Sequence, residues 1–501
     1  MIPSLSLPSL CDLLRTRPLP LAVHSGQVES GGVFLALPAP VPARRQGEAA
    51  GGERYFPDAL SRNPAYVVCS PEYLSLLESL LPPGSSCAAV PVESPREALG
   101  RIASAAYGTE ESCPLVFAVT GTNGKTTTAF LLEALFQSLG YKTGLVGTVA
   151  YRWPGFSRNA PLTTPDCLTL HDMLARMRAA GVSHVFMEVS SHAVDQERVA
   201  GIPFAGAIIT NLTQDHLDYH QDMDEYFTVK ARLFRPAAQG GLPLEDKIRV
   251  INADDAYCLR LIRERAGAVS FGLAPSSPSG SRHLAGRVAG LTPAGMRLNM
   301  SFEGDHWEIS SPLVGSFNAM NLLGVQALAL GIGLSPGDFG ALSSFAGVPG
   351  RLERIANKRN LNVFVDYAHT PDALVNVLSA LRAAGFARIV TVFGCGGNRD
   401  RTKRPLMGEA VARLSDVAVL TSDNPRFEDP EAIMADVLPG LAGCREVVTQ
   451  ADRRAALALA VSLTGPEDAL LVAGKGHETY QLIRDVKKPF SDQDTLRELL
   501  S

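Results

Sequence analysis

The fold is decided by Leu115-Val116-Phe117-Ala118-Val119 and the residues that follow it, Thr120-Gly121-Thr122-Asn123-Gly124-Lys125-Thr126-Thr127. The five apolar residues predict a short buried strand, and the pattern from Thr127 to Leu139 predicts a helix. Between them, the glycines allow backbone N–H groups to close around phosphate oxygens, and the helix N-terminus adds a positive dipole. Lys125 suits the β- and γ-phosphates, and Thr126 suits Mg²⁺. The stretch predicts a variant phosphate loop, because Val119 stands where the general pattern has glycine.

Outward from this loop, short apolar runs alternate with helical stretches. The runs are residues 185–187, 207–209 and 249–252, and later 363–365, 389–393, 417–420 and 470–473. This alternation is typical of βαβ units with a mainly parallel sheet. The chain before residue 110 is rich in Pro and Ala and has strand-like runs at 32–37 and 65–69. We therefore expect an α/β protein with three domains, 1–110, 111–345 and 346–501, of which the central one carries the P-loop sheet and the last is Rossmann-like.

Length and composition exclude several classes of protein. The 501 residues favour about three domains over a single small binding module. A net charge of −5 provides no general positive field for nucleic acid or an anionic membrane. The longest apolar run, around Leu322 to Leu334, is shorter than the roughly 18 residues of a membrane-spanning helix. The eight cysteines form no CxxC pair, which favours a reducing cytoplasm over a disulfide framework or a zinc site.

Charged residues follow several of the predicted strands, at the sheet edge where α/β proteins bind ligands. Glu188 ends the strand around 185–187 and is a candidate for holding Mg²⁺. His216 follows the next strand; taken singly, it is more typical of a structural histidine, because Mg²⁺ prefers oxygen ligands. In the third domain, Arg399, Arg426 and Glu478 all follow strands. Turn chemistry explains the neighbouring Gly, Asn and Pro residues but not the recurrence of these charges at one edge.

From about residue 115 onward, a series of motifs resembles those of the Mur ligases, the ATP-dependent amide-forming enzymes of peptidoglycan precursor synthesis. The matching motifs, in chain order, are TGTNGKTT (120–127), LTTPD (162–166), MEVSSHA (187–193), TNLTQDHLDYH (210–220), GSFNAMN (315–321), GRLE (350–353), DYAHTPD (366–372), FGCGGNRDR (393–401), DNPR (423–426) and AGKGHE (473–478). DNPR resembles the signature of members that bind diaminopimelate. The resemblance implies an acid–D-amino-acid ligase that adds meso-diaminopimelate to UDP-MurNAc-L-Ala-D-Glu through an acyl phosphate and releases ADP and phosphate.

The resemblance also implies two Mg²⁺ ions and four catalytic residues, Lys125, Glu188, His216 and Lys230. One ion is expected on Thr126 and Glu188, and the other on His216 and a carbamylated Lys230. A bare lysine is positive and would repel Mg²⁺, whereas CO₂ added to its neutral amine creates an anionic oxygen ligand. Two metal ions suit a reaction that brings two anions together.

The resemblance to the Mur ligases also implies substrate-binding residues at the matching motif positions of this sequence. Those expected at ATP are Gly121, Thr122, Asn123, Gly124, Lys125, Thr126, Thr127, Asn318, Arg351 and Asp366, the last two brought in by domain closure. Those expected at the UDP-linked acceptor are Ser25, Thr163, Thr164, Ser190, Gln196 and Arg198. Those expected at diaminopimelate are Arg399, Asp423, Asn424, Pro425, Arg426, Gly474 and Glu478. The uracil is expected in the first domain, where residues 24–26 read His-Ser-Gly and relatives have Asp-Ser-Arg.

Amino-acid selection follows from one chemical difference, the distal carboxylate that meso-diaminopimelate has and lysine lacks. Arg426 is expected to bind this carboxylate with two hydrogen bonds, Arg399 the other carboxylate, and Glu478 the ammonium. Lysine would leave a buried Arg426 without a partner, at a cost on the order of 2–5 kcal/mol, or roughly 30- to 3,000-fold.

Two other readings stay open at this point. One is a lysine-adding or folylpolyglutamate-type ligase of the same superfamily, for which DNPR has no evident purpose. The other is a P-loop ATPase that works as a switch or motor and needs neither acceptor nor amino acid. A nucleic-acid-dependent ATPase is disfavoured, since no basic, aromatic-rich stretch is present. For the ligase, we expect a cytoplasmic monomer without nucleic-acid partners or membrane insertion.

Overall fold

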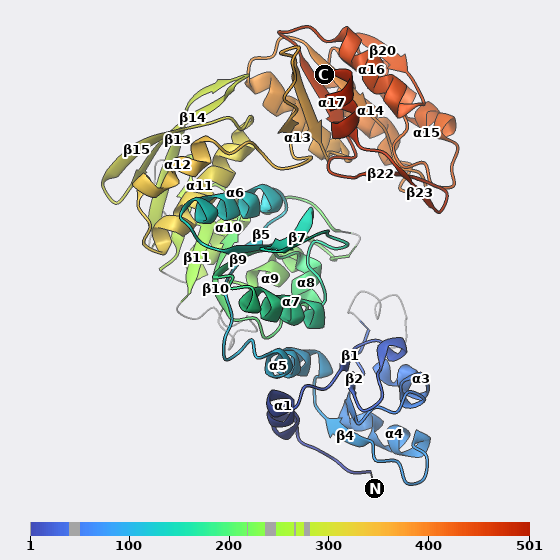
Figure 1. Cartoon of the computed structure of the whole chain (residues 1–501). Coiled ribbons are helices and arrows are strands. Elements are labelled where there is room, and N and C mark those ends of the chain that lie inside the picture. Colours follow the sequence, from blue (N-terminus) through green and yellow to red (C-terminus); the bar gives the residue numbers. More distant parts are fainter. Residues whose placement is uncertain (1, 40–50, 218, 236–246, 265–266, 275–280) are drawn as a thin grey trace. The chain divides into compact units, whose positions relative to one another are not determined.

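The computed structural model (Figure 1) describes residues 2–39, 51–217, 219–235, 247–264, 267–274 and 281–501. The chain forms two compact units. The first unit comprises Met1–Ser270, Pro278–Arg282 and Ala327–Gly333, and the second comprises Phe271–Ser277, His283–Gln326 and Leu334–Ser501. The α/β class and the mainly parallel sheets are confirmed, while the three-domain division stays a prediction. Among the described residues, no helix has the length and apolar character needed to cross a membrane.

The first unit begins with a four-stranded parallel sheet in the order β1-β2-β3-β4. Side chains alternate between its faces: Val33 and Leu35 pack towards α1 and α5, and Phe34 packs towards α3 and α4. The strands at Val33–Leu35 and Tyr66–Cys69 confirm the two predicted there. The elements are α1 (Leu7–Thr16), β1 (Leu21–Ala22), β2 (Val33–Leu35), α3 (Phe56–Leu60), β3 (Tyr66–Cys69), α4 (Leu74–Leu80), β4 (Ala88–Pro91) and α5 (Pro95–Tyr107).

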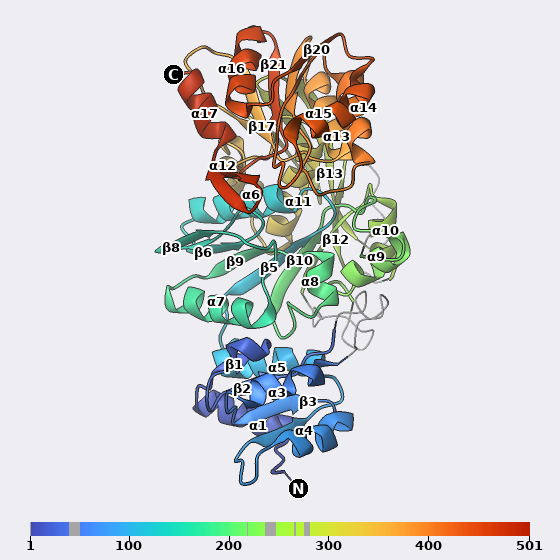
Figure 2. The ribbon, with the colours of Figure 1, turned by 90° about the vertical axis from the view of Figure 1, so that its right-hand side faces the viewer.

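The strands of the larger sheet in the first unit lie in the order β12-β11-β10-β5-β9-β6-β7-β8. The strands from β11 to β6 are parallel, and β7 and β8 form an antiparallel hairpin at the edge. Helix α6 lies on one face, and α7 and α8 lie on the other (Figure 2). The elements are β5 (Leu115–Thr120), α6 (Lys125–Ser138), β6 (Thr143–Val146), β7 (Ala150–Trp153), β8 (Phe156–Asn159), α7 (Cys167–Ala179), β9 (His184–Glu188), α8 (Ser191–Asp195), β10 (Phe204–Ile209), α9 (Met223–Ala231), β11 (Ile248–Asn252), α10 (Ala256–Glu264) and β12 (Val269–Gly272).

The phosphate loop joins β5 to α6 in the middle of this sheet. Strand β5 pairs with β9 and β10, so the three strands end next to one another, at Thr120, Glu188 and Ile209. Helix α6 begins at Lys125, two residues before the predicted start, because Gly124 takes a left-handed conformation (φ 84°) that turns the chain into the helix. At Gly121 (φ 138°), a Cβ would lie 2.0 Å from Thr210 Oγ1, so this position requires glycine.

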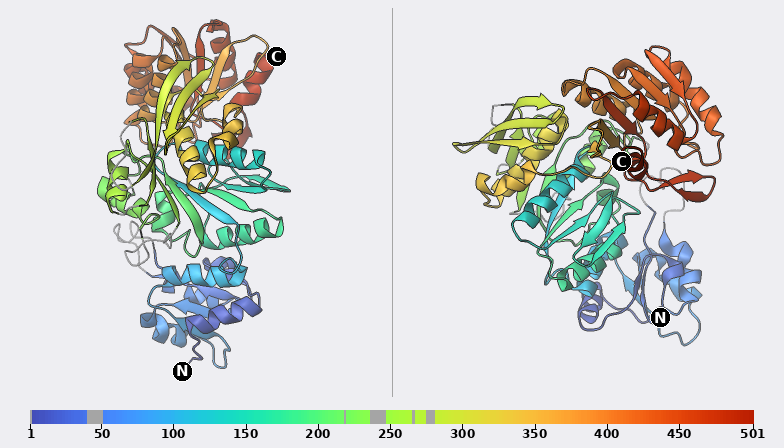
Figure 3. Two further views of the ribbon diagram at one scale, coloured as in Figure 1. Left: turned by 90° about the vertical axis from the view of Figure 1, so that its left-hand side faces the viewer. Right: turned by 45° about the horizontal axis from the view of Figure 1, so that its top comes forward.

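The second unit contains three antiparallel strands that the sequence analysis does not predict. They run in the order β15-β14-β13, with β13 at Arg282–Thr292, β14 at Gly295–Phe302 and β15 at Asp305–Ser311. Figure 3 shows them as long yellow-green arrows. Helix α11 (Ser316–Gly331), whose residues from Ala327 onward are assigned to the first unit, and the short α12 (Gly340–Ser343) follow.

The rest of the second unit is a sheet in the order β16-β17-β21-β18-β19-β20, parallel except for β16. Helices α13, α14 and α15 cover one face, and α16 and α17 cover the other (Figure 2). This doubly wound arrangement is Rossmann-like. The elements are β16 (Glu353–Arg354), β17 (Asn362–Asp366), α13 (Pro371–Ala383), β18 (Ile389–Phe393), α14 (Lys403–Leu414), β19 (Val417–Leu420), α15 (Pro430–Val437), β20 (Glu446–Thr449), α16 (Arg453–Leu463), β21 (Ala469–Ala473), β22 (Tyr480–Ile483), β23 (Val486–Pro489) and α17 (Asp492–Leu499).

Candidate active site

The phosphate loop is closed by its own lysine. Lys125 Nζ donates to the carbonyl oxygens of Gly121 at 2.9 Å and Thr122 at 2.7 Å. The loop is also tied to the next strand end, where Thr210 Oγ1 donates to the Asn123 carbonyl at 2.6 Å and Asn211 Oδ1 accepts from the Asn123 amide at 3.0 Å. These bonds hold an arch of backbone at the N-terminus of α6, which is the arrangement that binds phosphate.

Glu188 lies beside the first turn of α6 and is fully buried. Its carboxylate accepts hydrogen bonds from Thr126 Oγ1 at 2.9 Å, the Thr148 amide at 2.8 Å and Thr148 Oγ1 at 3.0 Å. The structure thus brings Thr126 and Glu188 together as predicted, with oxygen donors of the kind that Mg²⁺ prefers. The donor set fits Mg²⁺.

Lys230 is buried, with 1% of its surface exposed, and lies under the phosphate loop. Its Nζ donates to the Gly121 carbonyl at 3.0 Å and to Thr120 Oγ1 at 3.4 Å, and lies 4.8 Å from the centre of the Tyr226 ring. Burial lowers the pKa of Lys230 well below its ordinary value, and the positive charge of Lys125 lowers it further. The fold therefore favours a neutral amine, which is the form that reacts with CO₂.

His216 also lies near Tyr226, with the two ring centres 6.1 Å apart. Its backbone is left-handed (φ 54°), its Nε2 is 3.5 Å from an Asp215 carboxylate oxygen, and its ring meets His192 edge-on at 4.9 Å. Within the described ranges, no group of three or more His, Cys, Asp and Glu side chains is placed to hold a metal ion.

The residues expected at the acceptor surround the end of β9. Thr164 Oγ1 donates to the Glu188 carbonyl at 2.9 Å and accepts from the Ser190 amide at 3.2 Å, and Thr163 Oγ1 lies 3.1 Å from Thr148 Oγ1. Arg198 continues this group, because its Nη1 donates to the Thr164 carbonyl at 3.0 Å.

Gln196 is the fifth member of the acceptor group in this part of the fold. Its Oε1 accepts from Arg198 Nη2 at 2.8 Å, and its amide donates to Tyr219 Oη at 3.1 Å. The five predicted positions therefore form one connected network.

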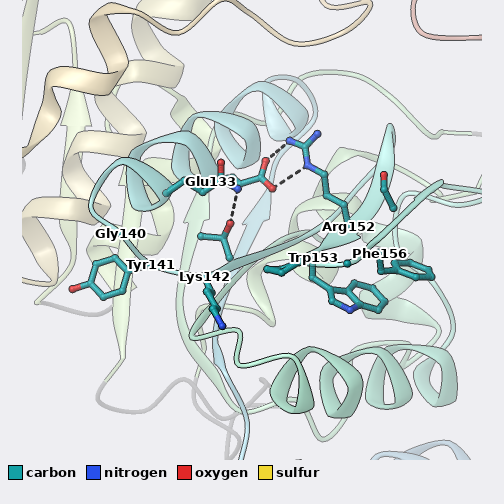
Figure 4. Close-up of a pocket in the computed structure, with 12 residues that line it drawn as sticks. Glu133, Gly140, Tyr141, Lys142, Arg152, Trp153 and Phe156 are labelled. Atoms are coloured by element: carbon teal, nitrogen blue, oxygen red, sulfur yellow. Dashed lines mark hydrogen bonds and ion pairs between the residues drawn. The ribbon is translucent and has the colours of Figure 1, made fainter.

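Ser25 lies apart from this network, at the start of a short 3₁₀ helix in the N-terminal sheet region. Its neighbour His24 lines a cavity of about 460 Å³ with Asp166 and Thr169 of the LTTPD region. A second cavity, of about 690 Å³, lies at the β7–β8 edge (Figure 4). Trp153 and Phe156 stack in its wall. None of the predicted site residues lines this second cavity.

In the second unit, Asp366 ends β17 and is buried. Its carboxylate accepts from the Leu352 amide at 2.6 Å and the Ala368 amide at 2.7 Å, and burial raises its pKa. Arg351 lies over the Tyr367 ring at 5.0 Å. Asn318, in the first turn of α11, donates to the Val314 carbonyl at 2.9 Å. Arg351 and Asp366 thus lie close together in the GRLE and DYAH segments, whereas Asn318 belongs to a separate element.

The residues expected at diaminopimelate come together at the carboxyl ends of β18, β19 and β21. Asn424 Nδ2 donates to Glu478 Oε2 at 2.9 Å, and a Cβ at Gly474 would lie 2.6 Å from Asp423 Oδ2. Arg399 and Arg426 both approach Gly396, where an added Cβ would lie 3.7 Å from Arg399 Cγ and 2.9 Å from Arg426 Nη1. Three strand ends therefore supply one group of residues, with Pro425 buried between Asn424 and Arg426.

Arg426 differs from expectation, because it is half-buried rather than buried. Its backbone is left-handed (φ 52°) and is held by Arg426 N donating to Leu482 O at 3.0 Å and Arg484 N donating to Arg426 O at 2.7 Å. Its Nη1 donates to the Gly397 carbonyl at 2.8 Å. The guanidinium is therefore partly exposed, and its hydrogen bond to the Gly397 carbonyl holds one of its nitrogens in place.

Comparison with known proteins identifies the family. The model of the Mur ligase middle domain matches residues 119–329, and that of the Mur ligase glutamate ligase domain matches residues 350–476. A UDP-N-acetylmuramoyl-L-alanyl-D-glutamate–2,6-diaminopimelate ligase of Lawsonia intracellularis is 53% identical over 480 residues, covering 96% of this chain and 95% of that protein. The chain belongs to the Mur ligase family. A ligase of the same name from Solibacter usitatus is 40% identical over 492 residues, covering 98% of this chain and 94% of that protein.

This Mur ligase is also similar to solved structures. A UDP-N-acetylmuramoyl-L-alanyl-D-glutamate–2,6-diaminopimelate ligase structure is 31% identical, covers 97% of this chain and 95% of that chain, and has a TM-score of 0.68. A folylpolyglutamate synthase of Mycobacterium tuberculosis, at 21% identity, covers 76% of this chain and 92% of that chain with a TM-score of 0.58. The second likeness shows a shared fold alone.

Several residues around the site of this Mur ligase are missed by the motif analysis. Gly147 and Thr148 cradle the Glu188 carboxylate, and a Cβ at Gly147 would lie only 2.2 Å from Glu188 Oε1. Lys475, inside the AGKGHE motif, is fully buried and pairs with Glu478 at 3.0 Å. For Gly147 and Thr148, the only indication in the sequence is the glycine itself, which follows the short strand at 143–146.

We expect Thr148→Val to weaken the response of this Mur ligase to Mg²⁺. Valine keeps the Thr148 amide bond to Glu188 but removes the hydroxyl that donates to Oε2. Loss of a residue that orients a metal ligand lowers metal affinity by about 10- to 100-fold. A Mg²⁺ titration of activity measures the shift. Thr143→Val, in the same strand region but bonded to Gln137, is the matched control, and equal shifts in both variants would contradict the role of Thr148.

Proposed function

We propose that the protein is an ATP-dependent ligase that joins meso-diaminopimelate to UDP-MurNAc-L-Ala-D-Glu in peptidoglycan precursor synthesis. The observation that carries the proposal is the group of Asn424, Arg426 and Glu478 at one sheet edge, where two cationic or amide donors and a carboxylate suit a diamino diacid. The name of relatives that are 40–53% identical over nearly the full chain supports the same substrates.

Residues of the first unit carry out phosphoryl transfer from ATP. The phosphate loop and Lys125 bind the β- and γ-phosphates of ATP. Thr126 and Glu188 would hold Mg²⁺, which would supply positive charge to balance that of the phosphoryl group being transferred. The carboxylate of the acceptor attacks the γ-phosphate, ADP leaves, and the acyl phosphate then reacts with the amine to give the amide and phosphate. Thr163, Thr164, Ser190, Gln196 and Arg198 orient the acceptor beside this loop, and Ser25 contacts its uridine end.

Lys230, if carbamylated, would hold a second Mg²⁺ together with His216. Support comes from its burial and from its lowered pKa, because an uncharged amine adds CO₂ and a protonated one does not. The bonds of Lys230 to Gly121 and Thr120 place the nitrogen directly beneath the phosphate loop. A carbamate there would bring a negative oxygen ligand beside the Gly121 carbonyl, the Thr120 hydroxyl and the Tyr226 ring.

The amino acid is held by the second unit. Arg426 binds the distal carboxylate, Arg399 the other carboxylate, and Asp423, Asn424, Pro425, Gly474 and Glu478 form the remaining wall. Asn318, Arg351 and Asp366 contact ATP. We further propose a monomer that works in the cytoplasm, with support from the eight thiols, all of which are free.

Phosphate release with single components omitted tests the proposed function. We expect release from ATP and Mg²⁺ only when UDP-MurNAc-L-Ala-D-Glu and meso-diaminopimelate are both present, because the acyl phosphate forms on one and is resolved by the other. A nucleotide switch or motor would release phosphate from ATP alone. A folylpolyglutamate-type ligase would need a different acceptor and would give no amide product with the UDP-dipeptide.

A further inference from the structure

Two loops of the second unit carry most of the residues proposed to bind the amino acid, and they leave the sheet from strands that do not pair with each other. Residues 423–426 follow β19, and residues 474–478 follow β21. In the order β17-β21-β18-β19, strand β18 lies between them. The hydrogen-bond ladder of the sheet therefore does not set the distance between these loops directly.

Arg453, the first residue of α16, spans this gap. Its Nη2 donates to the carbonyl oxygen of Ala473 at 3.0 Å, and its Nη1 donates to that of Ser422 at 3.4 Å. Ala473 is the residue before Gly474, and Ser422 is the residue before Asp423. One guanidinium therefore ties the backbone of both loops at the points where they leave their strands.

Asp492, the first residue of α17, holds this guanidinium in place. Its two carboxylate oxygens accept from Arg453 Nε at 2.8 Å and Nη2 at 2.7 Å, and neither side chain is exposed. A two-point pair of this kind fixes the plane and direction of the guanidinium. Burial by itself lowers the pKa of Arg453, but the carboxylates of Asp492, Asp423 and Glu478 raise it overall, so the group stays a cation.

Stability is a weak explanation for a fully buried ion pair, since apolar residues of similar volume often stabilise a core equally well. The direction of the remaining donors is more informative. Nε and one N–H of Nη2 meet the carboxylate, whereas Nη1 and the other N–H of Nη2 meet the carbonyls at the roots of the two loops.

We propose that Arg453, oriented by Asp492, is a positioning residue that sets the spacing of the 423–426 and 474–478 loops and thereby the affinity for an amino acid with a distal carboxylate. The inference rests on the proposed function, which supplies the ligand of these loops. Arg453 does not touch the substrate. It acts through the backbone from which Asn424, Arg426 and Glu478 project.

The test is the double variant Arg453→Met with Asp492→Val, which removes both charges together and leaves no unpaired ion in the core. We expect the KM for meso-diaminopimelate to rise about tenfold or more, as for the loss of at least one hydrogen bond to a charged group. The KM values for ATP and the UDP-dipeptide should stay within about twofold, because their proposed sites do not depend on this spacing. A thermal unfolding curve shows whether the variant is folded.

A matched control lies in the same sheet at the amino ends of the strands, away from the two loops. Arg382 pairs with Asp416 at 2.6 Å and donates to the carbonyls of Leu414 at 3.0 Å and Ala387 at 2.7 Å. Arg382→Met with Asp416→Val removes the same kind of clamp away from the two loops, and it should leave the KM for meso-diaminopimelate unchanged. If the first double variant does not fold, Arg453→Lys replaces it, since an ammonium keeps the charge pair but cannot reach both carbonyls in the same plane.

An unchanged KM for meso-diaminopimelate in a folded Arg453 variant would overturn the proposal, as would an equal rise in all three KM values or in the control. The proposed function is judged separately, on the wild type. If the wild type uses another amino acid, that result contradicts the proposed substrate, and the same comparison made with the accepted amino acid still decides the role of Arg453.

Discussion

Lys230→Ala is expected to lower kcat by a factor on the order of a hundred or more while ATP binding stays measurable, because a metal ligand supplies several kcal/mol to phosphoryl transfer. Lys230 lies beneath the phosphate loop, where it donates to Gly121 and Thr120, and its removal leaves Lys125 and the loop backbone in place for the phosphates. Turnover by phosphate release and binding of a fluorescent ATP analogue measure the two effects. Near-normal turnover would remove Lys230 from the mechanism.

Lys230→Arg separates a missing carbamate from a missing positive charge. Arginine keeps a cation in the pocket but forms no carbamate with CO₂, so we expect it to be as inactive as alanine. If arginine instead retained most of the activity, the side chain would act through its charge, and the modified-lysine hypothesis would fail. Lys142, at the edge of the cavity near β7 and β8, provides a control position for the Lys→Ala change itself.

The lowered pKa gives the direction of the pH dependence. Between the lowered pKa of Lys230 and its ordinary value of 10.5, the folded protein holds a neutral amine where an exposed lysine would be protonated. As the pH falls through the lowered pKa, the amine takes up a proton, the carbamate is lost, and activity should fall with it. Added bicarbonate should raise the activity of the wild type on this acid limb and should have no effect on Lys230→Ala.

Much of the site could be predicted because parallel strands bring their carboxyl ends to one edge. Glu188 and the phosphate loop are neighbours for this reason, since β5 and β9 pair in register up to Val119 and Glu188. The same rule brought Asn424 and Glu478 within hydrogen-bond distance although they are 54 residues apart. The apolar runs give the positions of the strands, and the strand ends then predict which residues lie close together.

What could not be predicted depends on partners that no motif marks. Thr148 donates twice to Glu188 from an ordinary turn, and Arg453 and Asp492 meet only because α16 and α17 pack on the same face. The antiparallel strands between 282 and 311 form no continuous apolar runs, because buried and exposed side chains are mixed along them. The burial of Arg426 also depended on the conformation of one turn.

Arg426→Gln is expected to remove most of the preference for meso-diaminopimelate over L-lysine. In the wild type, lysine leaves the guanidinium without the distal carboxylate, at a cost of about 2–5 kcal/mol for a buried charge. Because Arg426 is half-buried, water screens the unpaired charge and the lower end applies, or about 30-fold in kcat/KM. Glutamine removes the charge that lysine leaves unpaired and the charge that binds the distal carboxylate, so kcat/KM should rise with lysine and fall with meso-diaminopimelate, and most of the roughly 30-fold ratio should be lost. The measurement is kcat/KM for both amino acids.

The selectivity is expected to depend on Arg426 rather than Glu478, and the contacts of Glu478 are the reason. Its Oε2 already accepts from Lys475 Nζ at 3.0 Å and Asn424 Nδ2 at 2.9 Å, so part of its charge is balanced within the protein. Both amino acids carry an ammonium for Glu478, and only one carries a second carboxylate for Arg426. Glu478→Gln should therefore weaken both substrates together and leave their ratio near the wild-type value. Arg484→Gln, in the hairpin bonded to the Arg426 backbone, controls for loss of an arginine there. Comparable kcat/KM for both amino acids in the wild type would contradict the assignment of Arg426.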